Sequence, residues 1–132
     1  MILRRVDCVT VPVPDLESGL AFYRDRLGHG LTWRNARLGQ AGLAVAGADT
    51  EIVLSTDAPY APAWQVDSAD ATADLFAHSG GRVIEAPRDI PVGRLAIVED
   101  PFGNVLVLLD LTKGRYRTDA AGDVTGVEAP PG

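Results

Sequence analysis

The sequence repeats one order of structural signals at a spacing of 54 residues. Phe22 and Phe76 stand at equivalent places in two amphipathic segments. At the same offset, the apolar stretch TEIVLSTD, which begins at Thr50, overlays NVLVLLDL, which begins at Asn104. A repeat of this length is typical of one supersecondary unit used twice. We therefore expect the chain to fold from two copies of a single unit.

The first copy is expected to occupy about residues 3–57. Residues 5–13 alternate in polarity, which predicts a strand that ends at two prolines. Asp15 then precedes apolar residues at helical spacing, which predicts a helix over 15–27 with Asp15 as its N-cap. Three further strands are expected over residues 30–35, 38–46 and 51–55, separated by turn residues. The order is strand, helix, strand, strand, strand (βαβββ).

The second copy, over about residues 61–111, follows the same order. A strand over 63–66 leads into a helix that Asp67 and Ser68 are expected to cap and that ends at two glycines. The strands that complete the copy are expected over residues 82–85, 93–99 and 105–111. Residues 1–112 thus form one α+β domain, in which the two curved sheets enclose a cavity as the expected ligand site.

Residues 113–132 are rich in Gly, Asp, Thr and Pro and show no clear periodicity. This composition predicts a C-terminal tail that is partly disordered, with Tyr116 as an anchor for its first part.

The composition excludes several classes of function. The chain of 132 residues has a formal net charge of −6, which repels phosphate backbones, so binding to nucleic acid is not expected. The N-terminal apolar stretch is interrupted by Asp7 and two prolines, and it is too short for a signal peptide or a membrane span. Cys8 is the single cysteine, so no internal disulfide is possible and a cytoplasmic location is expected.

Two segments resemble a known family. VPVPDLESGLAFYRDRLG is similar to the first strand and helix of the vicinal oxygen chelate superfamily (glyoxalases, bleomycin resistance proteins and extradiol dioxygenases), and VEDPFGNVLVLLD is similar to its closing hairpin. The resemblance covers about residues 3–111. It implies the paired βαβββ fold, a homodimer and a small-molecule ligand.

Members of this family that chelate a divalent metal carry His or Glu ligands on the first and last strand of each repeat. The first-strand position falls on Cys8 here, or on Asp7 if the register shifts by one residue. The equivalent position of the second repeat falls on Ala61 or Pro62, whose side chains have no donor atom. A thiolate also suits zinc or copper(I) better than manganese, iron or magnesium.

The last-strand positions lack a carboxylate as well. The family pattern GNxxE reads GNVLV here, so Val107 stands where the glutamate is expected, and the repeat maps it onto Val53. Glu51 lies two residues from Val53 on the same strand face. A catalytic metal site needs about three protein ligands. Cys8 and Glu51 are the only candidates, so no metal cofactor is expected.

Five residues are candidates for binding a ligand. Trp33 and Trp64 offer flat aromatic surfaces for a planar or cationic molecule, although packing in the core is the competing interpretation. Glu51, Tyr60 and Arg94 are candidates for orienting the ligand through polar contacts. No catalytic residue is identified, because no nucleophile and base occur at a spacing typical of a known mechanism.

Three functional hypotheses remain open from the sequence. The leading one is a metal-independent protein that binds a small aromatic or amphipathic molecule. The first alternative is a metal-dependent lyase, isomerase or dioxygenase that uses Asp7, Glu51 and a residue of the second repeat. The second is a regulatory or interaction module whose cavity is filled by side chains such as Trp33, Trp64 and Phe102. The sequence specifies neither the ligand nor a reaction.

Overall fold

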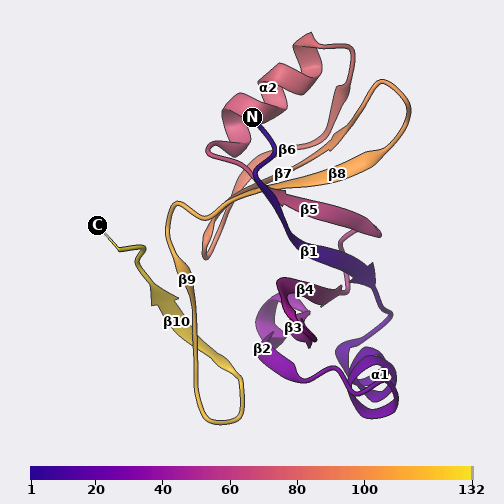
Figure 1. Cartoon of the computed structure of the whole chain (residues 1–132), viewed down its shortest axis with the longest axis vertical. Helices are drawn as coiled ribbons and strands as arrows, with labels where there is room; N and C mark the ends of the chain where they lie inside the picture. The colour runs from indigo at the N-terminus through magenta and orange to yellow at the C-terminus, as the bar shows by residue number, and fades with distance from the viewer. Residues whose placement is uncertain (132) are drawn as a thin grey trace. The chain divides into compact units, whose positions relative to one another are not determined.

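The computed structural model describes residues 1–131 and divides the chain into two compact units (Figure 1). The first-repeat unit contains Cys8–Tyr60 and Tyr116–Gly126. The second-repeat unit contains Met1–Asp7, Ala61–Arg115 and the residues from Val127 on. Each unit has its own hydrophobic core, and each is described by itself.

The strands of the first repeat, which we call the first-repeat sheet, follow the order β2-β3-β4-β1, in which β1 runs parallel to β4 and the other neighbours are antiparallel. Strand β1 begins in the second-repeat unit and enters this one at Cys8. The elements in chain order are β1 (Arg5–Pro12), α1 (Leu16–Leu20), the π-helical turn η1 (Ala21–Arg26), β2 (Leu31–Asn35), the 3-10 turn η2 (Ala36–Leu38), β3 (Gln40–Val45) and β4 (Ala48–Ser55).

The predicted helix start at Asp15 is confirmed. Its carboxylate accepts hydrogen bonds from the backbone N of Ser18 at 2.7 Å and from the Ser18 hydroxyl at 3.0 Å. These bonds stabilise the ionised form and lower the pKa of Asp15. Leu16 and Leu20 then pack against Leu43 and Leu54 of the sheet, so that α1 covers one sheet face. Burial of these apolar side chains holds the helix in place, because so short a helix is not stable alone.

The second-repeat unit has the corresponding strand order β6-β7-β8-β5, in which β8 pairs in parallel with β5. Its helix is capped by Ser68, whose Oγ accepts from the backbone N of Ala71 at 3.1 Å. The elements are β5 (Ala61–Gln65), α2 (Ala69–His78), β6 (Arg82–Ile90), β7 (Gly93–Glu99) and β8 (Val105–Asp110). Strand β6 continues well past the predicted end at residue 85, because irregular pairing lets it follow β7 to Ile90.

A buried carboxylate, Asp110, joins β8 to the start of α2. One oxygen accepts from the backbone N of Ala69 at 2.9 Å, and the other accepts from the backbone N of Arg94 and from Thr112 Oγ1, both at 2.9 Å. Asp110 is only 3% exposed, so these bonds satisfy a carboxylate that water hardly reaches. The role of Asp110 is not among the predictions from the sequence, although an acidic residue at the end of the apolar run VLVLL is a visible signal.

The C-terminal segment forms a hairpin where a partly disordered tail was expected. Strands β9 (Arg115–Thr118) and β10 (Val124–Glu128) pair with each other. The Asp119 side chain folds the turn between them by accepting from the backbone N of Ala121 at 2.9 Å and of Asp123 at 3.0 Å. Asp side chains often stabilise turns in this way, so the hairpin can form although the segment has no regular hydrophobic pattern.

The expected α+β class and the βαβββ order of each copy are confirmed. Within residues 1–131, no helix combines the length and the apolar character needed to cross a membrane.

Candidate functional site

The first-repeat sheet has one face covered by α1 and a second face that we call the helix-free face. Val11, Ile52 and Leu54 belong to the core under α1. Their neighbours along the strands point the other way, because side chains alternate across a sheet. The strand register places Cys8 beside Glu51, Thr10 beside Val53, and Trp33 beside Gly42. The helix-free face is defined by Cys8, Thr10, Trp33, Gly42, Glu51 and Val53.

Two of the predicted ligand-binding residues meet on this face. The indole Nε1 of Trp33 donates a hydrogen bond to Glu51 Oε1 at 3.0 Å. The hydroxyl of Thr32 donates to the other oxygen, Oε2. The two donors fix the position of the Glu51 carboxylate from two sides. The arrangement presents an aromatic surface next to an oriented anion.

Gly42 provides the space in which the indole lies. A Cβ atom at this position would stand 2.1 Å from Trp33 Nε1 and 2.6 Å from Cδ1 and Cε2. The indole therefore rests against the backbone of β3, and one of its sides is closed by that strand. Sequence analysis did not single out Gly42 as a packing position, although a glycine inside a strand often marks such a close approach.

Gly42→Ala is expected to push the indole off β3 and to break its hydrogen bond to Glu51. Overpacking of this kind lowers the free energy of unfolding by about 2 kcal/mol. Urea denaturation followed by circular dichroism measures the loss. Gly30→Ala is the matched control, because a Cβ at Gly30 meets no atom within 4 Å. Equal stability of the two variants would contradict the packing described for Trp33.

Tyr116, which the hairpin contributes to the same unit, contacts the indole. The ring centroids of Trp33 and Tyr116 are 4.9 Å apart, with an angle of 45° between the ring planes. Asn35 Nδ2 donates to the Tyr116 hydroxyl at 3.4 Å. Burial raises the pKa of Tyr116 above its usual value, and the Asn35 bond opposes this in part. The sequence predicts an anchoring role for Tyr116, but its position beside Trp33 is not predicted.

The positions at which family members carry metal ligands can be compared with the residues present. Cys8 and Glu51 are neighbours in the first-repeat sheet. In the second-repeat sheet, Val107 pairs with Ala63, so Ala61 and Val107 share a face, and neither has a donor atom. No three His, Cys, Asp or Glu side chains among the described residues gather as a ligand set. These residues do not fit a chelated divalent metal ion.

Asp7, the alternative first-strand ligand, takes part in contacts of the second-repeat unit. Its Oδ1 accepts from Gln65 Nε2 at 2.7 Å and from Arg115 Nη1 at 3.3 Å. The carboxylate thus forms a partly buried ion pair with Arg115.

The other predicted ligand-binding residues do not lie on the helix-free face. In the second-repeat unit, Trp64 is in register with Leu108, which packs under α2, so Trp64 lies on the helix-covered side. Arg94 lies on that side too and forms ion pairs with Asp70 at 2.7 Å and with Asp89 at 3.2 Å. The Arg94 hydrogen bond lowers the pKa of Asp70. In the first-repeat unit, Tyr60 is 72% exposed on the loop that follows β4.

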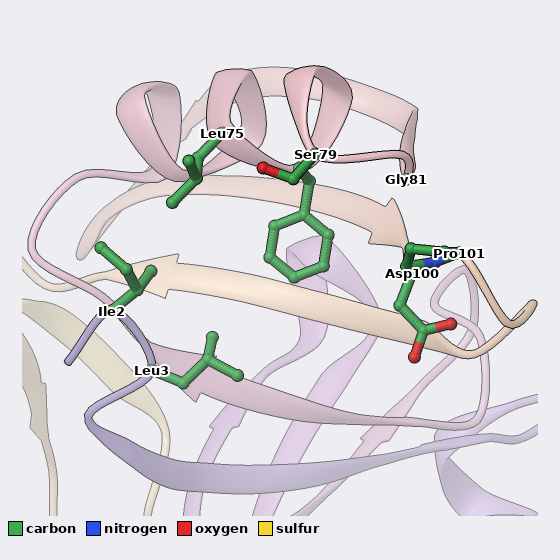
Figure 2. Close-up of a pocket in the computed structure, with 8 residues that line it drawn as sticks. Ile2, Leu3, Leu75, Ser79, Gly81, Asp100 and Pro101 are labelled. Atoms are coloured by element: carbon green, nitrogen blue, oxygen red, sulfur yellow. The ribbon is translucent and has the colours of Figure 1, made fainter.

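The second-repeat unit also contains an apolar groove of about 330 Å³ near the end of α2. Figure 2 shows Leu75 pointing from the helix toward the side on which Ile2 and Leu3 lie. Asp100 is a polar residue of the lining, but its carboxylate accepts from the backbone N of Phe102 and Asn104 within its own turn. The lining residues are Ile2, Leu3, Leu75, Phe76, Ser79, Gly81, Asp100 and Pro101. This groove offers little with which to orient a polar ligand.

A family model for the glyoxalase/bleomycin resistance protein/dioxygenase superfamily matches residues 5–108. The match covers most of the chain and includes both repeats and the helix-free face. The chain belongs to this superfamily.

Two curated mycobacterial proteins are similar to the chain. Both are called CFP32 and are named provisionally as glyoxylases, one from Mycobacterium bovis (strain ATCC BAA-935 / AF2122/97) and one from Mycobacterium tuberculosis (strain CDC 1551 / Oshkosh). Each is 38% identical over 104 residues, which is 73% of this chain and 39% of the relative. The chain therefore spans about two fifths of the length of these relatives.

Solved structures share the fold. The crystal structure of methylmalonyl-CoA epimerase from Mycobacterium tuberculosis has a TM-score of 0.63 and 25% identity, and the match covers 83% of this chain and 89% of that one. The Streptomyces coelicolor methylmalonyl-CoA epimerase in complex with 2-nitronate-propionyl-CoA has a TM-score of 0.61 and 24% identity, over 82% of this chain and 97% of the other. The second likeness shows the fold alone.

Proposed function

We propose that the protein binds a small planar aromatic molecule on the helix-free face of the first-repeat sheet, without a catalytic metal. The observation that supports this most strongly is the position of the Trp33 indole, which is held against Gly42 and hydrogen-bonded to Glu51. A rigid aromatic surface offers stacking at little cost in conformational entropy. The neighbouring polar groups give the ligand an orientation.

A cationic ligand fits this arrangement better than an anionic one. The Glu51 carboxylate lies beside an aromatic ring, and both attract positive charge. The net charge of −6 on the chain adds a long-range preference of the same sign.

The experiment is a calorimetric titration of the metal-free protein with proflavine, a planar aromatic cation. Anthraquinone-2-sulfonate, a planar anion of similar size, is the matched control ligand. We expect saturable binding of proflavine and binding of the anion at least about tenfold weaker, which corresponds to about 1.4 kcal/mol. Equal binding of the two ligands, or no binding of either, would overturn the proposal.

Glu51→Gln is expected to weaken proflavine binding by about fivefold while leaving the binding of anthraquinone-2-sulfonate unchanged. The substitution keeps the size of the side chain and a carbonyl oxygen that can accept from Trp33, but it removes the charge. Asp74→Asn is the matched control, because it removes the same charge from an exposed position on α2. A similar loss in both variants would assign the preference to net charge alone.

The metal-dependent alternative has its own support. One structure that shares the fold is named as a methylmalonyl-CoA epimerase, and the curated relatives are named provisionally as glyoxylases, so both carry the names of enzymes. A lyase, isomerase or dioxygenase mechanism needs donor atoms where this chain has Ala61 and Val107. Stoichiometric binding of Mn²⁺, Ni²⁺ or Zn²⁺ that is lost in Glu51→Ala would favour this alternative.

The proposal includes a homodimer located in the cytoplasm. Strand β6 is the outermost strand of the second-repeat sheet, and outer strands in this architecture are a natural place for a second copy to pair. Sedimentation velocity distinguishes the dimer from a monomer of 13.9 kDa.

A further inference from the structure

The hairpin segment Tyr116–Gly126, which we call the strap, belongs to the same compact unit as the helix-free face. Its turn is hydrogen-bonded to strand β2. The backbone N of Arg34 donates to Gly122 O at 2.8 Å, and Arg34 also forms a parallel bridge with Asp123. Gly122 lies so close to Leu31 that a Cβ there would stand 3.0 Å from Leu31 Cδ2. The turn of the strap therefore lies alongside β2, the strand that carries Trp33.

The attachment brings the Tyr116 ring onto two residues of the helix-free side of β2. Trp33 and Asn35 are two positions apart on this strand, so their side chains point to the same side. Tyr116 contacts the indole of one and accepts a hydrogen bond from the amide of the other. Because the backbone at Gly42 already closes one side of the indole, Tyr116 uses part of the aromatic surface that remains.

The contacts that hold Tyr116 are weak enough to be exchanged. A tilted pair of aromatic rings contributes about 0.5–1.5 kcal/mol, and a hydrogen bond as long as that from Asn35 adds little. The strap also lies beyond residues 5–108, the part that the family model matches. It occupies aromatic surface that a stacking ligand needs.

We infer that the strap closes the ligand site and that Tyr116 is its latch, so that a planar ligand must displace the Tyr116 ring from Trp33. The inference rests on the proposed function and adds regulation of the same site. The apparent affinity for the ligand is then the intrinsic affinity multiplied by the fraction of molecules in which the strap is released, so it rises as that fraction rises. The phenol ring occupies the place that an aromatic ligand takes.

The test compares variants in a Trp64→Phe background, in which Trp33 is the single tryptophan. Tyr116→Ala removes the latch. Asp119→Ala removes the side chain that stabilises the turn. Asp119 is not part of the helix-free face, so this variant loosens the strap without changing the ligand site itself. Tyr116→Phe keeps the ring and loses only the hydroxyl. Asp74→Ala is the control for charge, and thermal unfolding by circular dichroism checks that each variant is folded.

We expect Tyr116→Ala to tighten proflavine binding by about three- to tenfold, the equivalent of the lost ring contact. Asp119→Ala should tighten binding by a smaller factor, and Tyr116→Phe should stay within about twofold of the parent protein. Weaker binding in Tyr116→Ala would overturn the inference, because it would make Tyr116 part of the binding surface. Unchanged binding in both Tyr116→Ala and Asp119→Ala would overturn it as well.

Acrylamide quenching of Trp33 fluorescence without any ligand separates this inference from the proposed function. Release of the strap exposes the indole, so quenching should increase in Tyr116→Ala and in Asp119→Ala. If proflavine binds to none of the variants, the proposed function and the ligand gate both fail. If proflavine binds but quenching is the same in all variants, the proposed function stands and the latch is contradicted.

Discussion

Trp33→Ala is expected to weaken proflavine binding by about 30-fold or more, because it removes both the stacking surface and the cation–π contact, together worth about 2 kcal/mol. The loss should exceed that in any other single variant of the helix-free face, since Trp33 also fixes Glu51 through the bond from Nε1. Calorimetric titration measures the effect without relying on tryptophan fluorescence.

Two further variants show which property of Trp33 matters. Trp33→Phe keeps an aromatic ring but loses the hydrogen bond to Glu51, so an intermediate loss of about threefold is expected. Trp64→Phe is the matched control, because Trp64 lies on the helix-covered side of the second-repeat sheet and should leave binding unchanged. A comparable loss in Trp33→Ala and Trp64→Phe would place the site elsewhere.

Asp110→Ala is expected to lower the free energy of unfolding by about 3 kcal/mol, since it removes the acceptor of three hydrogen bonds and leaves the buried backbone N of Ala69 without a partner. The donors come from the first residue of α2, from β7 and from the loop after β8, so the substitution removes hydrogen bonds that connect these three segments. Urea denaturation followed by circular dichroism gives the value.

Asp74→Ala serves as the control for this measurement. It removes the same charge from an exposed position of α2 and should change stability by less than about 0.5 kcal/mol. An effect of Asp110→Ala no larger than that of the control would show that Asp110 does not join these elements.

The features that the sequence predicts well are those set by local pattern. The alternating strands and the Asp15 cap depend on neighbouring residues, and the structure contains both. The 54-residue spacing holds for the core residues Leu54 and Leu108, but in the first helical segment Tyr23 packs against the core and Phe22 is exposed. Trp33 and Glu51 were both candidates for the site, but their contact depends on the register of three strands and on an irregularity between Leu31 and Trp33. Pairing of that kind is non-local and cannot be read from one strand alone.

The sheet face on which a side chain lies is the feature that is hardest to predict from this sequence. Trp64 and Arg94 were candidates for the cavity, yet each shares a sheet face with residues packed under α2. A shift of one position reverses the face of every side chain in a strand, so small errors in strand register misplace a site residue completely. Gly42 and Asp110 were missed for a related reason, because their roles come from partners on other strands.

The most direct test of metal-free ligand binding at Trp33 is the indole N–H resonance of this residue in a ¹H–¹⁵N spectrum of protein treated with EDTA. We expect proflavine to shift the Trp33 Nε1–H signal saturably and to leave the Trp64 signal in place. Added Mn²⁺ or Zn²⁺ should not change the midpoint of the proflavine titration. A Trp33 signal that moves only after metal is added, or a ligand effect confined to Trp64, would contradict metal-free binding at Trp33.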